Sequence, residues 1–258
     1  MIETASTGTE YLRSLRLAQP QAGLFGLDAP DFPQVVFDGA KDQAVVAGSE
    51  VVSFTESVEA EFREIISDSA LVAQFGANAK YKVEQDPIAW FDHYYSILGG
   101  MGWVTQSRET AEYQFKKDGL EVHEAVLEVV EAFLGPIPGA AKLVKIALGS
   151  LAKMDDSPLI TLFNKQSEKA NVGRFQFTLV RQEGSSFLAD GMSFGIKAKK
   201  NVTQILFFKL HSAEARMRRS LAKVSIGADA LEGLRDQLKI MIQAHRNKFL
   251  TELPLAFE

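Results

Sequence analysis

The sequence predicts an α+β protein whose helices and strands fall in separate parts of the chain. Apolar residues recur every three or four positions in three stretches, residues 53–75, 86–98 and 120–154. After Asn171 the apolar spacing changes to two, and a capped amphipathic segment follows from Asp229. We therefore expect a mostly helical part, residues 1–171, and then a four- or five-stranded antiparallel sheet in residues 172–258 that a C-terminal amphipathic helix covers. The two parts form either two domains or one continuous structural unit.

Composition narrows the classes of protein. Of the 258 residues, 46% are hydrophobic and 24% are charged, which is ordinary for a globular chain. Because the chain has no cysteine, disulfides, thiolate metal sites, iron–sulfur clusters and a cysteine nucleophile are excluded. Residues 1–20 hold no apolar stretch of the length that a secretory signal needs, so we expect synthesis in the cytoplasm. Export by a non-classical route or release by lysis stays open, because no oxidative folding step is required.

Charge is distributed unevenly along the chain. The net charge is −5, but residues 1–171 hold 14 Lys+Arg against 25 Asp+Glu, whereas residues 172–258 hold 14 against 8. The basic residues in the region of the predicted sheet are Lys197, Lys199, Lys200, Arg216, Arg218, Arg219 and Lys223. Such a basic patch can attract lipid headgroups, nucleic acid or an acidic protein. The simpler interpretation is that the acidic and basic parts attract each other.

The first hundred residues predict two long helices after an irregular start. The start indicates a short helix near Tyr11 and a hairpin within residues 34–46. A capping-box spacing that begins at Ser53 predicts a helix of about twenty residues. Asp86-Pro87 supplies an N-cap and a first-turn proline, and predicts an aromatic, well-buried helix that two glycines end.

Residues 120–154 predict a helical hairpin that turns at the Gly-Pro-Ile-Pro-Gly sequence of residues 135–139. In the first arm an apolar face lies opposite a row of glutamates, Glu121, Glu124, Glu128 and Glu131. In the second arm small and apolar residues lie opposite three lysines, Lys142, Lys145 and Lys153. One arm is therefore acidic and the other basic. A further helix is expected from Ser157.

The last third of the chain predicts the sheet and its covering helix. Alternating apolar residues predict strands over residues 174–179 and 192–198, and a continuous apolar run predicts a central strand over residues 204–210. A hairpin of two short strands is expected around residues 218–220. The amphipathic helix is expected from Leu231 to Phe249, on one face of the sheet.

One motif resembles a catalytic one. Residues 191–195 match G-x-S-x-G, and Ser193 precedes Asp229, Asp236 and His245 in the chain order of hydrolases. A nucleophile elbow needs a strand before the serine and a helix after it, whereas Ser193 lies inside a predicted strand. We therefore expect Ser193 to be a solvent-facing serine on an ordinary strand.

Other chemistry is weakly indicated. An aromatic and basic sheet can bind single-stranded nucleic acid, but Phe207 and Phe208 lie in a run that we expect to be buried, which disfavours this function. No phosphate-binding loop occurs. The histidines stand at no metal-ligand spacing, so no metal or cofactor is expected; they are His93, His123, His211 and His245.

The predicted hairpin leads to the main functional hypothesis. No acidic residue occurs from Ala132 to Met154, and the second arm has the composition of helices that lie in a membrane interface. The pattern also resembles the buried helical hairpins of pore-forming bacterial toxins. The residues expected to interact with the membrane are Lys142, Leu143, Val144, Lys145, Ile146, Leu148, Leu151 and Lys153.

We therefore predict a non-enzymatic, membrane-active, toxin-like protein that docks on anionic membrane and inserts the hairpin, as a monomer or an oligomer. Each arm is shorter than the roughly 20 apolar residues of a membrane span. Insertion would require the carboxylates to be neutralised, so low pH is the expected trigger. The expected pH sensors are Glu121, Glu124, Glu128 and Glu131.

Two alternatives remain open. In the first, the chain is a protein-binding or structural module, and the glutamates and lysines form ion pairs across the hairpin. In the second, it is an enzyme of unrecognised chemistry, for which the Ser193 motif is the available lead.

Overall fold

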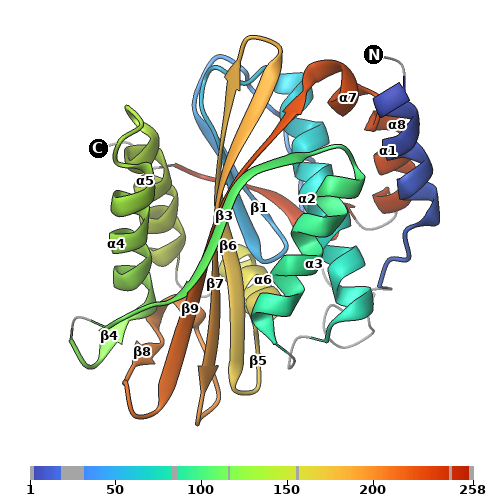
Figure 1. Cartoon of the computed structure of the whole chain (residues 1–258). Coiled ribbons are helices and arrows are strands. Elements are labelled where there is room, and N and C mark those ends of the chain that lie inside the picture. Colours follow the sequence, from blue (N-terminus) through green and yellow to red (C-terminus); the bar gives the residue numbers. More distant parts are fainter. Residues whose placement is uncertain are drawn as a thin grey trace.

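A twisted sheet with helices against both of its faces forms the centre of the molecule (Figure 1). The computed structural model describes residues 3–18, 32–82, 86–115, 117–154, 157–243 and 246–255. The strand order is β10-β1-β2-β6-β7-β9-β3, with β5 paired to β6. Among the described strands β2 and β6 pair in parallel and the other neighbours pair antiparallel. The strands of this sheet are β1 (Gln43–Ala47), β2 (Glu50–Phe54), β3 (Val104–Glu112), β5 (Glu168–Lys169), β6 (Val172–Glu183), β7 (Ser186–Ala198), β9 (Ala215–Gly227) and β10 (Leu250–Leu253).

The helices form unequal layers on the two faces. On one face α2 and α3 pack against the sheet, and α1, α7 and α8 pack against them; on the other face lie α4 and α5 (Figure 1). The helices of the first layer are α1 (Glu3–Ser14), α2 (Ala60–Lys80), α3 (Pro87–Gly100), α7 (Ala228–Glu232) and α8 (Arg235–Ile242). The remaining elements are α4 (Val122–Leu134), α5 (Ala140–Ala152), α6 (Pro158–Ser167), α9 (Arg246–Phe249), the 3-10 helix η1 (Ile205–Phe207), and the short paired strands β4 (Leu120–Glu121) and β8 (Lys209–Leu210).

The sheet separates two hydrophobic cores. Successive side chains of a strand point to opposite faces, so one strand contributes to both cores. In β7, Phe187 and Ala189 belong to the core beneath α2 and α3, whereas Met192, Phe194 and Ile196 belong to the core beneath α4 and α5. Because both faces are covered, nearly every residue of the central strands is buried, instead of every second one.

Several elements agree with the sequence-based expectation. Asp86 caps α3 by accepting a hydrogen bond from the backbone of Ile88, and Ser157 caps α6 by accepting one from Ile160. The short hairpin before residue 54 is β1 and β2, although it covers residues 43–54 instead of 34–46. The molecule is thus mixed α and β with a mostly antiparallel sheet.

The expected separation of helices from strands is wrong. Strands β1, β2 and β3 all precede Asn171, and β2 pairs with β6 while β3 pairs with β9. Strand β3 was not predicted because it is an edge strand whose residues are mostly exposed and polar, and so it has no apolar alternation. The capping-box start at Ser53 is also wrong, since Ser53 lies in β2 and α2 begins at Ala60.

Two expected strands have a different form. The apolar run of residues 204–210 is not a central strand but η1 followed by the two residues of β8, and Gln204 interrupts the extended backbone with a φ of +49°. The hairpin expected around residues 218–220 is instead one continuous strand, β9. The residues that suggested a turn, Arg218, Arg219 and Ser220, belong to this strand, where Arg218 and Ser220 point to one face and Arg219 to the other.

The C-terminal region also differs from the single helix that we expected over the sheet. It contains α7, α8 and α9, and α8 packs against α2 and α1 instead of the sheet. His245 lies outside the described residues. The chain then returns to the sheet, because β10 pairs with β1.

Candidate functional site

Helices α4 and α5 form a layer of their own on one face of the sheet. The start of α4 is fixed by a capping box, in which the side chain of Glu121 accepts from the backbone of Glu124 and that of Glu124 accepts from the backbone of Glu121. Residues 135–139 connect the two helices, and Gly139 there has a φ of +75°, which glycine adopts without strain. The two helices pack against each other and against the sheet.

This layer is attached to the sheet almost entirely by apolar contacts. The buried residues of α4 are Val122, Ala125, Val126, Val129, Val130 and Leu134. Those of α5 are Ala140, Leu143, Val144, Ala147, Leu148 and Leu151, together with Ser150. Beneath them lie large apolar side chains of the sheet, including Phe175, Phe177, Phe194 and Met217. Burial of this kind has no preferred direction, and it stabilises in proportion to area.

The ion pairs of α4 and α5 lie at the outer surface, and two further polar contacts of α4, of Glu128 and of His123, are part-buried. Tyr113 donates its hydroxyl hydrogen to Glu128 over 2.6 Å, and Lys117 contacts Glu124 at 3.4 Å. Lys145 of α5 forms an ion pair with Glu131 of α4. Exposed ion pairs of this kind each contribute about 0–1 kcal/mol. The ion pairs of Glu124 and Glu131 therefore hold the layer weakly.

The pKa of Glu124 is lowered, first because it accepts a hydrogen bond from the backbone of Glu121 and then because of Lys117. Glu124 therefore stays charged at pH 5. A carboxyl that does titrate near neutrality is Glu168 of β5, where partial burial raises the pKa to about 7. Glu168 accepts a backbone hydrogen bond from Gln204, directly before η1.

The expected membrane-interacting residues of α5 divide into two groups. Leu143, Val144, Leu148 and Leu151 are buried against the sheet, whereas the lysines and Ile146 face outward. The outward group borders an open hollow of about 510 Å³, lined among others by Lys142, Lys145, Ile146, Lys153 and Glu131. The hollow thus brings three lysines together, one of which, Lys145, pairs with Glu131.

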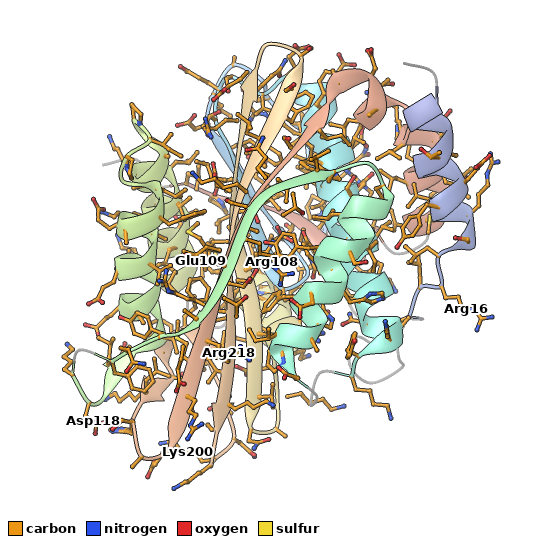
Figure 2. All side chains as sticks on the ribbon, viewed as in Figure 1. Arg16, Arg108, Glu109, Asp118, Lys200 and Arg218 are labelled. Carbon is orange, nitrogen blue, oxygen red and sulfur yellow. The ribbon has the colours of Figure 1, made fainter. Side chains whose placement is uncertain are left out.

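The seven residues of the basic patch also fall into groups with different surroundings. Arg219 contacts Glu109 at 3.6 Å, Lys223 lies over the ring of Phe133, and Lys200 contacts Glu214 at 3.7 Å, while Lys199 is exposed. The other three members are exposed on the face that α3 covers only in part: Lys197, Arg216 and Arg218. Figure 2 shows Arg218 and Lys200 toward the same end of the sheet. The structure thus separates Arg219 and Lys223, which contact Glu109 and Phe133, from the members of the patch near the Ala198 end of the sheet.

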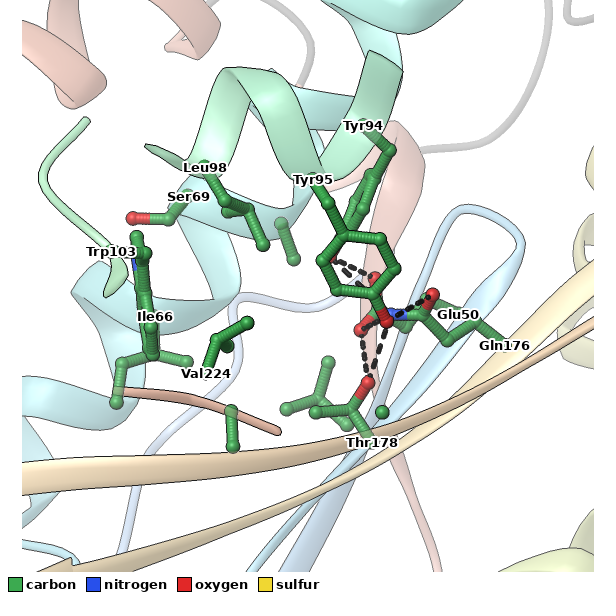
Figure 3. Close-up of a pocket in the computed structure, with 14 residues that line it drawn as sticks. Glu50, Ile66, Ser69, Tyr94, Tyr95, Leu98, Trp103, Gln176, Thr178 and Val224 are labelled. Atoms are coloured by element: carbon green, nitrogen blue, oxygen red, sulfur yellow. Dashed lines mark hydrogen bonds between the residues drawn. The ribbon is translucent and has the colours of Figure 1, made fainter. Parts of the chain in front are cut away.

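A buried polar cluster between α3 and the sheet was not predicted. Glu50 of β2 is 2% exposed, and its carboxylate accepts hydrogen bonds from Tyr94 at 2.8 Å, Thr178 at 2.6 Å and Gln176 at 2.8 Å (Figure 3). The cluster borders a cavity of about 30 Å³, large enough for one or two water molecules. Burial raises the pKa of Glu50. A single glutamate between two apolar runs, AVVAGS and VVSF, was the available sequence signal.

Ser193 belongs to the edge of this cluster. It lies in the middle of β7, is fully buried, and contacts the side chains of Gln176 and Tyr95. The expectation that Ser193 faces solvent is wrong, because α3 covers that face of the sheet. No helix follows it, since β7 continues to Ala198, so the strand–turn–helix of a nucleophile elbow is not formed.

The described histidines have separate partners. His211 contacts Asp118 at 2.9 Å, His123 contacts the carbonyl of Leu206 at 3.2 Å, and His93 lies against the ring of Tyr81. In the part of the chain that the structure describes, no three His, Asp or Glu side chains are grouped so that they could hold a metal ion. Among the same residues no helix has the length and the apolar character needed to cross a membrane.

Comparison with known proteins gives distant structural similarity. No family model matches the chain, and no curated protein matches it. A solved structure described as a delta-endotoxin is 14% identical with a TM-score of 0.42, over 77% of this chain and 88% of that one. The activated Cyt2Ba monomer from Bacillus thuringiensis subsp. israelensis is 14% identical with a TM-score of 0.40, over 68% and 96%. The Evf virulence factor is 11% identical with a TM-score of 0.31, over 82% and 86%. The chain therefore resembles toxin and virulence-factor structures in fold alone, and resemblance at these TM-scores does not bear on what it binds.

Proposed function

We propose that the protein is membrane-active, and that α4 and α5 leave the sheet to lie in the interface of an anionic membrane. The observation that carries this proposal is the apolar attachment of these two helices. Their departure breaks surface contacts such as that of Tyr113 with Glu128, and it uncovers Val, Ala and Leu side chains. A bilayer interface can take up apolar surface of this kind, whereas water cannot do so without a large increase in free energy.

Lengths and charges favour an interfacial position over a spanning one. Each helix has 13 residues and is about 20 Å long, which is shorter than the roughly 30 Å hydrocarbon core. In an interfacial position the glutamates and lysines remain among the headgroups. The glutamates then need not be neutralised, so the proposal does not depend on an acid trigger. Lys142, Lys145 and Lys153 would meet the phosphates of anionic lipid.

The separate cores make such an opening local. The core beneath α2 and α3 contains no residue of α4 or α5. The sheet can therefore stay folded on α2 and α3 while the other layer moves, which confines the cost of opening to one core.

The test follows one position on each layer with a fluorescent dye. The chain has no cysteine, so Ile146→Cys and Ile240→Cys each give a single labelling site. Ile146 lies in the lysine-lined hollow of α5, and Ile240 is 71% exposed on α8. With an environment-sensitive dye and anionic vesicles, we expect a blue shift and quenching by a lipid-borne quencher at position 146, and no change at position 240. Changes at both positions would indicate general unfolding on the vesicle, and changes at neither would reject the proposal.

Leakage from dye-loaded vesicles tests the part that the lysines play. Lys142→Glu/Lys145→Glu should reduce leakage from anionic vesicles, because it reverses two charges on α5. The control Lys41→Glu/Lys239→Glu alters net charge equally at exposed residues outside α4 and α5, and should leak like the original chain. Equal loss in both variants would show that net charge alone matters. If vesicles are neither bound nor permeabilised, a protein-binding module becomes the better explanation.

A further inference from the structure

The two ends of the central sheet carry opposite charge. Strands β7 and β9 run the length of the sheet, and their register pairs Ser186 with Gly227 at one end and Ala198 with Ala215 at the other. A strand of 13 residues is about 40 Å long, so these ends are far apart. Six exposed cations gather around the end near Ala198, here named the basic end: Lys197, Lys199, Lys200, Lys209, Arg216 and Arg218.

Exposed carboxylates gather at the opposite end, while Glu112 and Glu214 lie at the basic end beside Arg218 and Lys200. Gln182 binds Ser57 and Glu59, and the backbone of Ala228 donates to Ser185, so the end of β2, the β6–β7 turn and the start of α7 lie together. Six exposed carboxylates belong to these segments and to the adjoining first turn of α2, here named the acidic end: Glu56, Glu59, Glu61, Glu183, Asp229 and Glu232. Among the few cations there, Arg235 pairs with Glu232 and Glu61.

Two cations of the basic end are placed in an unfavourable way, because Lys197 stands directly opposite Arg216 on the neighbouring strand. Arg218 follows on the same side of β9, where Glu112 of β3 stands opposite it. Directly opposed like charges destabilise an antiparallel pair. Within the described residues none of these three cations makes an ion pair or a side-chain hydrogen bond. A surface that binds polyanions would relieve this repulsion.

We infer that the basic end is the surface with which the protein docks on anionic lipid headgroups, an inference that rests on the proposed membrane function. The net charge of −5 repels an anionic bilayer, so attraction requires that the basic end face the lipid and the acidic end point away. The strands then stand steeply on the membrane. The start of α4 adjoins β8 at the basic end, so α4 begins close to the headgroups.

Lipid fits this surface better than single-stranded nucleic acid. Proteins that bind single strands combine cations with exposed aromatic rings on which the bases stack. The rings of β6 and β7, Phe175, Phe177 and Phe194, are buried beneath α4 and α5. The basic end therefore offers charge on extended strands without a stacking surface.

Binding to vesicles tests the docking surface. Each Lys or Arg held at an anionic bilayer strengthens binding about fivefold. Lys197→Gln/Arg216→Gln/Arg218→Gln should thus weaken co-sedimentation with phosphatidylserine-containing vesicles on the order of 100-fold at low salt. The matched control Lys41→Gln/Arg235→Gln/Lys239→Gln removes the same charge outside the basic end and should not weaken binding. Equal weakening in both variants, or none in the first, overturns the inference. If the original chain binds single-stranded RNA more tightly than vesicles, and the first variant loses this RNA binding, the choice of lipid is overturned.

Orientation is tested with two serines at opposite ends. Energy transfer from a dye on Ser212→Cys, in the turn before β9, to labelled lipid should be strong, while transfer from Ser185→Cys should be weak. Equal transfer from both positions overturns the inference. The docking surface and the movement of α4 and α5 can be rejected independently. If the triple variant binds vesicles as well as the original chain, and the dye at position 146 still shows its blue shift, the docking surface alone is rejected. If energy transfer from position 212 to the lipid is strong but the dye at position 146 shows no blue shift, the proposed movement of α4 and α5 alone is rejected.

Discussion

The two helical layers are attached to the same sheet by different kinds of contact. On the α2–α3 side, buried polar side chains reach from the helices to the sheet and its loops: Gln74 donates to the carbonyl of Ala47, and Tyr94 to Glu50. Asp68 of α2 also accepts from Arg246 at 2.7 Å. On the α4–α5 side the residues that the two helices bury are apolar except Ser150, and the ion pairs lie at the surface.

This difference decides which layer can move. Separating α2 from the sheet would leave buried donors and acceptors without partners, at about 1–3 kcal/mol each. Separating α4 and α5 exposes apolar area but leaves few polar groups unpaired. One layer is therefore fixed in position by directional bonds, and the other is held by contacts that another apolar surface could replace.

Removing a polar anchor from the first layer should have the largest effect on stability. Arg63 is fully buried and donates to the backbone carbonyls of Val58 at 2.8 Å, Lys41 at 2.9 Å and Thr55 at 3.0 Å. Arg63→Met leaves these three carbonyls without their donor, and we expect the free energy of unfolding to fall by about 3–5 kcal/mol. Urea unfolding measures it, with the exposed Lys142→Met as the control, expected within about 0.5 kcal/mol. A loss below about 1 kcal/mol for Arg63→Met would contradict the anchoring role.

Hydrogen exchange should separate the layers directly. Amides of α5 such as those of Val144 and Leu148 should exchange through a partial opening about 2 kcal/mol less costly than the opening that exposes Leu71 and Val72 of α2. All four side chains are fully or almost fully buried, so exposure alone does not predict a difference. Native-state exchange at increasing low urea measures it. Identical opening free energies in both helices would mean that the layers open together.

A smaller effect on the free energy of unfolding is expected from pH. Because acid stabilises the fold through Glu168, the direction of this effect opposes an acid trigger. Burial raises the pKa of Glu168 to about 7, from its ordinary value of about 4.5. The folded state thus holds the proton more tightly than the unfolded state, so the stability gained from protonation is complete below about pH 4.5 and is lost as the pH rises through 7. Because Glu168 is only partly buried and solvent screens its charge, we expect a loss of only about 1 kcal/mol.

Comparison with Glu168→Gln isolates this contribution. The difference in unfolding free energy between the variant and the original chain should be small at pH 4.5 and should grow in favour of the variant up to pH 8. Glu168 accepts from Gln204 ahead of η1, and η1 packs against α4, so opening of α4 should also be easier at pH 8 than at pH 5. Parallel stability profiles for the two chains would show that Glu168 does not titrate in this range.

The sequence predicts well those elements whose signals are local. The cap at Asp86 and the proline after it suffice to place α3, because a helix N-terminus is determined by a few neighbouring residues. The outward lysines of α5 and the glutamates of α4 follow from helical periodicity in the same way. Strand β3 has no such signal, since it is held by pairing with β9, more than 100 residues later.

Sites that depend on tertiary contacts were not predictable in the same way. Glu50, Gln176 and Ser193 come from three strands that become neighbours only in the folded sheet, so their cluster leaves little trace in any one segment. The basic patch appeared as one feature because its members are close in sequence. Strand alternation sends Arg218 and Arg219 to opposite faces, which only the position of the helices on each side reveals.

The opposite charge of the two sheet ends also bears on how molecules meet one another in solution. The acidic end of one molecule is complementary to the basic end of the next, and such a head-to-tail contact uses two different patches. After every addition the assembly still has one free acidic end and one free basic end. Molecules therefore join into open filaments instead of closed dimers. These filaments should lengthen at low ionic strength and dissociate as added salt shortens the range of electrostatic attraction.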